Sequence, residues 1–248
     1  AKAGGLGRTM MARLAELLSQ ATEPAQEEAL LNSALRLLAK YRSTLIQNTL
    51  VKAHGTRVQA GPFAGMVFLD RSAEGCHVPK LLGCYEEELH DVLKDLPRRG
   101  YRTVLNIGCA EGYYAVGIKR LLPDAAVFAY DIDPVARQAC AALAAKNGVA
   151  IEVGGEFAPA DFGRFAREAG EVLVWCDIEG AEVELLDPAK APALAGMDLV
   201  VELHPSAAGH ALEVVPPRFA ATHVVDIRHS RGHDPELPPF LQQLGHLD

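Results

Sequence analysis

Apolar and polar positions follow a repeating order from Arg102 onward. Short apolar runs, predicted as β-strands, lie near residues 102–107, 125–131, 149–153, 171–177, 197–203 and 222–228. Segments with the spacing of amphipathic helices lie between them, near residues 112–122, 134–146, 158–168 and 181–186. Apolar strands that alternate with helices are typical of a parallel sheet covered by helices on both faces. The pattern therefore predicts an α/β fold with a doubly wound, mostly parallel sheet.

The N-terminal part of the chain has a helical pattern instead. Residues 10–53 are predicted as helix, and Thr22, followed by Glu-Pro, marks a helix start within them. An apolar stripe with helical spacing consists of Leu31, Ala34, Leu38, Tyr41 and Leu45. We expect a helical arm over residues 1–55. Its stripe packs on the main domain, forms a homodimer contact or covers a substrate site.

The main domain is expected over residues 56–248, with its core from about residue 100. Ahead of that core, residues 56–84 are predicted as short strands and loops, and residues 79–93 as a loop that leads into a helix. Residues 1–9 precede the first methionine and are expected to be a remnant of cloning.

The composition is ordinary for a soluble globular protein, with 49% hydrophobic and 23% charged residues. A net charge of −8 argues against a basic nucleic-acid-binding face along the whole chain. No apolar run approaches the roughly 18 residues needed to span a bilayer, and the N-terminus lacks the apolar region of a signal peptide. The five cysteines include no C-x-x-C pair, which favours reduced thiols and a cytoplasmic location.

A glycine-spaced turn follows the apolar run that begins at Thr103. Small residues at Gly108, Ala110 and Gly112 let a ligand come close to the backbone. Asp131 ends the next apolar run, near the offset of about 20 residues at which an acid binds ribose hydroxyls in nucleotide-binding βαβ units. Together these features predict a nucleoside-binding βαβ unit.

The glycine spacing separates two classes of nucleoside ligand. Dinucleotide-binding turns read G-x-G-x-x-G, whereas this turn reads G-x-A-x-G. Glu111 sits where a diphosphate would need backbone amides, and a carboxylate there would repel it. The same carboxylate is compatible with a cofactor that carries a sulfonium and an ammonium group.

Four sequence segments resemble motifs of class I S-adenosylmethionine-dependent methyltransferases. L-N-I-G-C-A-E-G is similar to the first motif of that family, with Asn106 in place of the usual acid, and Y-D-I-D-P is similar to the second. V-W-C-D-I-E-G-A-E-V-E-L-L resembles the D-x-E-G-A-E segment of FkbM-type methyltransferases, and K-L-L-G-C-Y-E-E-E-L resembles the stretch before the first motif in such proteins. The resemblance covers roughly residues 76–204 and implies a Rossmann-like methyltransferase core.

The resemblance implies S-adenosylmethionine as the cofactor, with Asp131 on the ribose hydroxyls and Gly155 and Glu156 near the adenine. The full set of implied cofactor-binding residues is Lys80, Tyr85, Asn106, Gly108, Ala110, Glu111, Gly112, Asp131, Ile132, Gly155, Glu156 and Asp177. The implied substrate-binding residues are His77, Tyr113, Tyr114, Glu182 and Glu202.

Methyl transfer needs alignment of donor and acceptor, and a base when the acceptor is a hydroxyl. The expected catalytic residues are Asp177, Glu179 and His204, because each follows a predicted strand and ligands bind at the carboxyl ends of such strands. Glu202 and His204 are two residues apart, so they point to one face. Two other interpretations stay open: His204 belongs to a polar rim, or Glu179 and Glu182 are favourable charges in the first turn of the next helix.

Asp177, Glu202 and His204 offer oxygen and nitrogen donors for Mg²⁺, Mn²⁺ or Zn²⁺. Their spacing is not that of the metal-dependent O-methyltransferases, and no metal site is expected. A basic cluster near the C-terminal end either binds an acceptor carboxylate or phosphate or forms a solvated face. It consists of Arg218, Arg228, His229, Arg231 and His233.

These observations predict a methyltransferase that acts on a small or medium-sized acceptor, peptides and glycans included, and most readily on a hydroxyl oxygen. Two alternatives remain: an NAD(P)-dependent oxidoreductase, and a non-catalytic protein that binds S-adenosylmethionine. The methyltransferase family usually closes its sheet with two strands after this point, whereas only one strand is predicted after residue 220.

Overall fold

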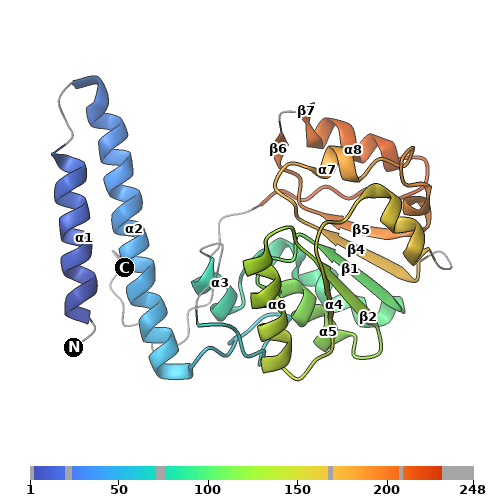
Figure 1. Ribbon diagram of the computed structural model, residues 1–248, viewed down its shortest axis with the longest axis horizontal. Helices are drawn as coiled ribbons and strands as arrows, with labels where there is room; N and C mark the ends of the chain where they lie inside the picture. Colours follow the sequence, from blue (N-terminus) through green and yellow to red (C-terminus); the bar gives the residue numbers. More distant parts are fainter. Residues whose placement is uncertain (1–2, 20–23, 71–75, 167–169, 207–208, 231–248) are drawn as a thin grey trace. The chain divides into compact units, whose positions relative to one another are not determined.

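The computed structural model (Figure 1) describes residues 3–19, 24–70, 76–166, 170–206 and 209–230. Contacts divide the chain into two compact units; of the described residues, those up to Gly55 belong to the first and those from Thr56 onward to the second. Each unit is described by itself below.

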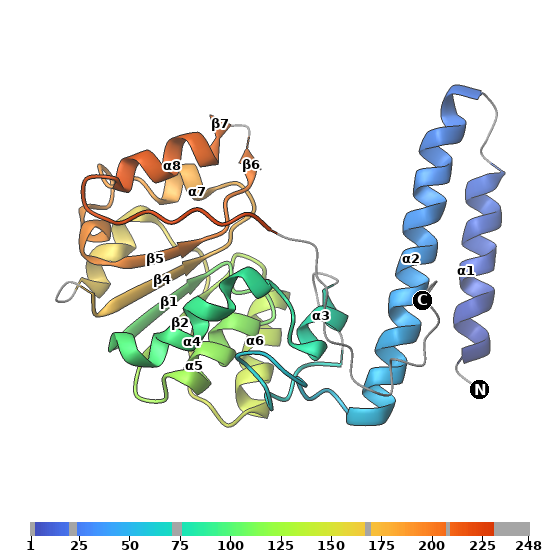
Figure 2. The ribbon, with the colours of Figure 1, turned by 180° about the vertical axis from the view of Figure 1, so that it is seen from behind.

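The N-terminal unit is a pair of helices, α1 (Ala3–Leu18) and α2 (Pro24–His54), which lie side by side (Figures 1 and 2). The sequence predicted helix over residues 10–53; the first helix begins earlier, and the chain turns before α2. The predicted helix start at Thr22 lies outside the described residues. Within the predicted stripe, Ala34 is buried, whereas Leu31, Leu38 and Leu45 are exposed.

The larger unit is built on a five-stranded parallel sheet with the strand order β3-β2-β1-β4-β5. The strands are β1 (Thr103–Ile107), β2 (Ala126–Tyr130), β3 (Glu152–Gly154), β4 (Val172–Cys176) and β5 (Asp198–Val201). Every residue of β1 and β4 is buried, as expected for central strands of a sheet covered on both faces. Five of the six predicted strands are therefore confirmed.

Helices cover both faces of this sheet (Figures 1 and 2), which confirms the doubly wound α/β fold. One face carries α4 (His90–Arg99), α5 (Tyr113–Leu121) and α6 (Pro134–Lys146). The other carries α7 (Glu182–Leu185) and α8 (Ala211–Phe219), together with the 3₁₀ helices η2 (Pro159–Phe165) and η3 (Pro192–Gly196). The remaining elements are α3 (His77–Leu82), η1 (Glu87–Leu89) and a two-stranded ladder of β6 (Pro205–Ser206) and β7 (Gly209–His210).

The alternation of side chains along the central strands assigns each residue to one face. Leu105 and Val174 pack with Phe162 of η2 and Phe219 of α8 in one apolar core. Residues one position further along point to the opposite face, so Asn106, which pairs in register with Trp175, faces the side of α4 and α5. This polar side chain therefore lies near the carboxyl end of β1.

The chain continues from β1 to β2 on one side of the sheet and resumes with β4 on the other side of β1. This reversal creates a switch point between the carboxyl ends of β1 and β4, where α/β sheets bind their ligands. Among the described residues, no helix combines the length and hydropathy that a membrane-spanning segment requires.

One predicted strand was wrong, one predicted helix is shorter and of a different type, and one helix was missed. The segment 222–228 forms no strand; its Val224 is fully exposed, and the His223 backbone nitrogen donates to the Phe219 carbonyl instead. Its β-branched residues favour extension, but a strand needs a ladder partner, and no described segment pairs with it. The helix predicted at 158–168 is the shorter 3₁₀ helix η2, and α8 was not predicted because Pro216 and Pro217 interrupt its sequence pattern.

Candidate active site

The turn after β1 packs against the end of β4 at the switch point. Gly108 has a φ of 78°, and a side chain there would place its Cβ 1.6 Å from the Asp177 carbonyl oxygen. Gly112 has a φ of 89°, and its Cβ would lie 2.7 Å from Cys140 Sγ. Only glycine tolerates both the conformation and the contact. Packing within the protein therefore requires glycine at both positions. The sequence had suggested instead that these small residues allow the close approach of a ligand.

A small pocket opens beside this turn. Its lining residues are Lys80, Tyr85, Asn106, Gly108, Cys109, Ala110, Tyr113, Tyr114, Trp175 and Asp177. The sequence assigned eight of these to the cofactor or substrate and missed Cys109 and Trp175. Trp175 could have been found, because it lies two residues before Asp177 on a strand that ends at the switch point.

Aromatic rings form much of the pocket wall. The rings of Tyr114 and Trp175 lie 4.4 Å apart between centroids, and those of Tyr85 and Tyr113 lie 5.7 Å apart, edge to face. Burial raises the pKa of Tyr85, Tyr113 and Tyr114 well above the usual value of tyrosine. The three phenols are therefore neutral hydrogen-bond donors at any physiological pH, and the Tyr114 hydroxyl donates to Glu86.

Lys80 and Glu111 form a buried ion pair next to the aromatic rings. The Lys80 Nζ lies 2.7 Å from Glu111 Oε1 and 4.8 Å from the centroid of the Tyr85 ring. Glu111 is 1% exposed and does not line the pocket. The prediction that its carboxylate repels a diphosphate loses its basis, because the adjacent ammonium neutralises its charge.

Asn106 contributes a buried acceptor to the pocket. Its Nδ2 donates to the Trp175 carbonyl oxygen at 3.3 Å, which fixes the amide. Its Oδ1 has no hydrogen-bond partner among the described residues. A buried acceptor without a partner is costly, so a ligand that donates to Asn106 is favoured.

The other predicted cofactor residues lie at the ends of β2 and β3, along the same edge of the sheet. Asp131 accepts hydrogen bonds from the backbone nitrogens of Ala110 at 2.9 Å and Asp133 at 2.8 Å, which hold its carboxylate in place. Each carboxylate oxygen retains a second lone pair. Ile132 is exposed, and Gly155 and Glu156 directly follow β3. None of these four residues lines the pocket beside Gly108.

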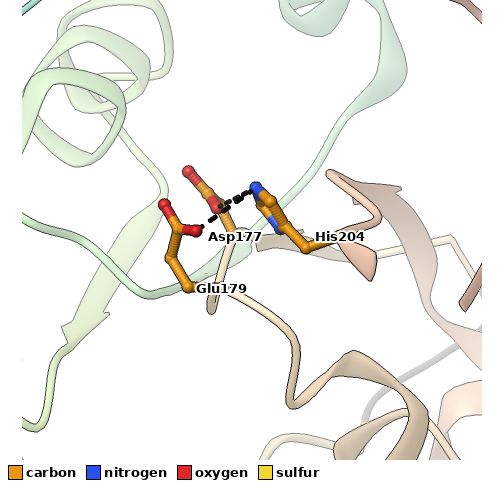
Figure 3. Close-up of side chains that lie close together, drawn as sticks. All are labelled: Asp177, Glu179 and His204. Carbon is orange, nitrogen blue, oxygen red and sulfur yellow. Dashed lines mark ion pairs between the residues drawn. The ribbon is translucent and has the colours of Figure 1, made fainter. Parts of the chain in front are cut away.

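The three predicted catalytic residues come together on the other side of the pocket (Figure 3). His204 Nε2 lies 3.9 Å from Asp177 Oδ1, 3.7 Å from Glu179 Oε2 and 3.5 Å from Glu202 Oε1. On the other edge of the ring, Nδ1 donates to Glu182 Oε1 at 2.9 Å. Four carboxylates thus surround one imidazole, and we refer to these five residues as the acidic cluster.

The acidic cluster shifts the pKa of its members. Burial alone would lower the pKa of His204, but the hydrogen bond to Glu182 and the nearby carboxylates outweigh it and raise the pKa above its usual value. Burial, followed by the charge of Glu86, raises the pKa of Glu202. Glu182 is completely buried and lines neither cavity, so its role is to orient His204 rather than to contact a substrate.

A groove continues from the pocket along the edge strand β5, and the two share Tyr85, Tyr114, Trp175 and Asp177 as a common wall. Residues 222–230 form part of the far side of the groove. Arg228 holds this segment by donating to the Glu88 carbonyl oxygen and pairing with Asp91.

Two residues that the sequence suggested for ligand binding interact with backbone carbonyl oxygens of the protein in the structure. His77 is buried away from both cavities, and its Nε2 lies 2.8 Å from the Leu69 carbonyl oxygen. Arg218 of the predicted basic cluster donates to the carbonyl oxygens of Val183 and Leu186. Arg231 and His233 lie outside the described residues.

No family model and no curated protein sequence matches the chain. Among solved structures, the bifunctional kinase-methyltransferase WbdD is similar with a TM-score of 0.37 and 19% identity, over 63% of this chain and 35% of that chain. An O-methyltransferase family protein from Burkholderia thailandensis has a TM-score of 0.28 and 16% identity, over 65% of this chain and 52% of that chain. Coclaurine N-methyltransferase, bound to N-methylheliamine and SAH, has a TM-score of 0.33 and 14% identity, over 78% of this chain and 56% of that chain.

The chain therefore spans between 35% and 56% of the length of these solved structures. With TM-scores no higher than 0.37, the three similarities assign no family to the chain. The chemistry of the pocket and of the acidic cluster is the basis for the proposal of a function.

Proposed function

We propose that this protein transfers a methyl group from S-adenosylmethionine to a small or medium-sized acceptor, with a hydroxyl oxygen as the favoured target. The observation that carries this proposal is the chemistry of the pocket wall. Asn106 Oδ1 is a buried acceptor with no partner among the described residues, and four aromatic rings line the same space. Both features suit a ligand with positive charge, because amide oxygens bind ammonium groups and ring faces attract cations.

A dinucleotide suits the same wall less well. A diphosphate binds to N–H donors and cations. Among the described residues that line the pocket, the only cationic side chain is Lys80, and its ammonium already pairs with Glu111 at 2.7 Å. The Asp177 carboxylate adds negative charge to the pocket lining. These features favour a sulfonium cofactor over the NAD(P) of the alternative oxidoreductase.

The residues of this chain would then bind the cofactor from one end to the other. When bound, S-adenosylmethionine supplies an electrophilic methyl group on its sulfonium. Asn106 Oδ1 accepts from the ammonium, and Asp131 accepts from the ribose hydroxyls through its remaining lone pairs. Gly155 and Glu156 lie next along the sheet edge, where they border the adenine.

The groove along β5 is the proposed site of the acceptor, which is a small molecule, a peptide or a glycan. Tyr114, Trp175 and Asp177 belong to both cavities, so a group held in the groove can meet the cofactor at this wall. A hydroxyl that attacks there must lose its proton, and the acidic cluster accepts it through a carboxylate or His204. The D-I-E-G-A-E segment, which supplies Asp177 and Glu179, supports an enzyme of the FkbM type.

Calorimetric titration of the full chain with S-adenosylmethionine, S-adenosylhomocysteine and NAD tests this proposal. We expect both adenosyl ligands to bind and NAD not to bind. Asp131→Ala and Asn106→Leu should each weaken adenosyl binding by at least about tenfold, which corresponds to roughly 1.4 kcal/mol. Asp124→Ala, which removes an exposed acid, is the matched control and should bind like the unaltered chain. Binding of NAD alone would contradict the proposal.

Transfer itself needs a second assay, because a non-catalytic binder would pass the first. Incubation with S-adenosylmethionine labelled on the methyl group, together with panels of hydroxylated small molecules, peptides and glycans, should yield a labelled product. Binding of the cofactor without label transfer to any member of a broad panel would favour the non-catalytic alternative.

A further inference from the structure

We propose that Asp177, Glu179 and His204 form a binding site for a divalent metal cation at the acceptor side of the pocket. The sequence led us to expect no metal, because the spacing of Asp177, Glu202 and His204 along the chain is not that of the metal-dependent O-methyltransferases. In the structure, Glu179 lies beside Asp177 and His204, and Glu202 Oε1 lies 3.5 Å from the same His204 nitrogen. One donor atom from each of Asp177, Glu179 and His204 lies within 4.8 Å of the other two (Figure 3).

The spacing of these donor atoms suits a shared cation. Mg²⁺ or Mn²⁺ lies about 2.1 Å from each ligand atom, so that two ligands of one ion are at most about 4.2 Å apart. His204 Nε2 lies 3.9 Å from Asp177 Oδ1 and 3.7 Å from Glu179 Oε2, within that limit. The side chain of Glu179 is 80% exposed, so it can close the remaining gap without disturbing the core.

The orientation of His204 is a second and separate observation. Its Nδ1 donates to Glu182, whose carboxylate is completely buried and also accepts from the Gly180 backbone nitrogen. In the neutral imidazole, this hydrogen bond keeps the proton on Nδ1 and leaves the lone pair on Nε2, the nitrogen nearest to Asp177 and Glu179. Histidines that bind metals are oriented in this way by a carboxylate on the far ring nitrogen.

Charge supports the same conclusion. Glu182 Oε2 is buried and has no hydrogen-bond partner among the described residues. The ion pairs that the structure describes for Glu179, Glu182 and Glu202 are all with His204. One imidazolium balances a single negative charge, whereas a divalent cation would balance two in a partly buried place where excess charge is costly.

The donor set indicates which cations fit. Two carboxylates and one imidazole, without a thiolate, favour Mn²⁺ and Mg²⁺ over soft metals. Water or an acceptor oxygen completes the coordination. Resting on the proposed function, the cation would hold the acceptor hydroxyl and lower its pKa, and Glu202, next to His204, would take the proton.

Titration of the EDTA-treated full chain with Mn²⁺, followed by electron paramagnetic resonance and calorimetry, tests the metal site. We expect one saturable site, and a loss of affinity of about 10- to 100-fold in Glu182→Gln, whose side chain only orients His204. Glu179→Gln and His204→Gln should weaken binding at least as much. The control is Glu184→Gln, which removes an exposed carboxylate of α7, the helix that begins at Glu182. Glu184 does not belong to the acidic cluster, so this variant should bind Mn²⁺ as the unaltered chain does.

Two results would overturn the site: no saturable binding of Mn²⁺ at millimolar concentration, or binding that Glu179→Gln and His204→Gln leave unchanged. Circular dichroism checks that each variant is folded, and the exposed position of Glu179 makes its variant the safest. Titration with S-adenosylhomocysteine in parallel separates the two proposals. Mn²⁺ binding without binding of this ligand supports the metal site and contradicts the proposed function.

Discussion

The buried ion pair between Lys80 and Glu111 gives the sharpest prediction about stability. The Lys80→Met variant keeps an apolar side chain of similar length but removes the ammonium that lies 2.7 Å from Glu111 Oε1. The carboxylate is 1% exposed and would remain in the core with its charge no longer balanced by Lys80. Breaking one side of a buried pair in this way costs about 3–5 kcal/mol.

A double variant separates the loss of the pair from the loss of packing. In Lys80→Met/Glu111→Leu both charges are absent, and apolar replacement of a whole buried pair is often neutral or stabilising. We therefore expect the double variant to recover most of the lost stability. The part that it does not recover includes the contact of the ammonium with the ring of Tyr85, which is worth up to about 2 kcal/mol.

Urea unfolding followed by the fluorescence of Trp175, the single tryptophan of the chain, measures these effects in the larger unit. Arg99→Met, which breaks the exposed pair with Asp95, is the control and should cost less than about 1 kcal/mol. A loss in Lys80→Met as small as that of the control would refute the reasoning. A double variant as unstable as the sum of the two single variants would also refute it.

Two further predictions concern the region around the turn and the segment before it. Burial lowers the pKa of His77, so the unfolded chain binds a proton more readily than the folded protein does. The free energy of unfolding should therefore fall as the pH drops from about 7 to about 5. In urea unfolding at several pH values, His77→Phe should flatten this slope. Equal slopes in both proteins would contradict it. Gly108→Ala would force a Cβ to 1.6 Å from the Asp177 carbonyl oxygen and should lower the free energy of unfolding by more than about 3 kcal/mol. Gly148 also has a positive φ, 65°, but no atom lies within 4 Å of the place that a Cβ would take, so Gly148→Ala should lower it by only about 1 kcal/mol. Similar losses of stability in the two variants would show that the packing of the turn does not matter.

The strands could be predicted because each core strand is an apolar run that ends at a glycine or a polar residue. Once five parallel strands are placed, the rule that ligands bind at their carboxyl ends brings Asn106 and Asp177 to one edge. For this reason most of the residues that line the pocket are among those that the sequence assigned to the cofactor or substrate. The strand predicted at 222–228 was wrong because local alternation does not supply a ladder partner.

Tertiary contacts between distant residues could not be predicted. Lys80 and Glu111 are 31 positions apart, and nothing in either local pattern indicates that they pair. The sequence therefore treated Glu111 as a free carboxylate at a turn. The position of Glu179 beside Asp177 and His204 depends on a loop with a positive φ at Glu179, which no periodicity encodes.

The most direct test of the proposed cofactor is the fluorescence of Trp175 during titration with S-adenosylhomocysteine and, separately, with NAD. This tryptophan lines both the pocket and the groove, so its emission reports a ligand at this wall. We predict a saturable change with S-adenosylhomocysteine, reduced in Asn106→Leu, and none with NAD. A saturable change with NAD and none with S-adenosylhomocysteine would contradict a methyltransferase function.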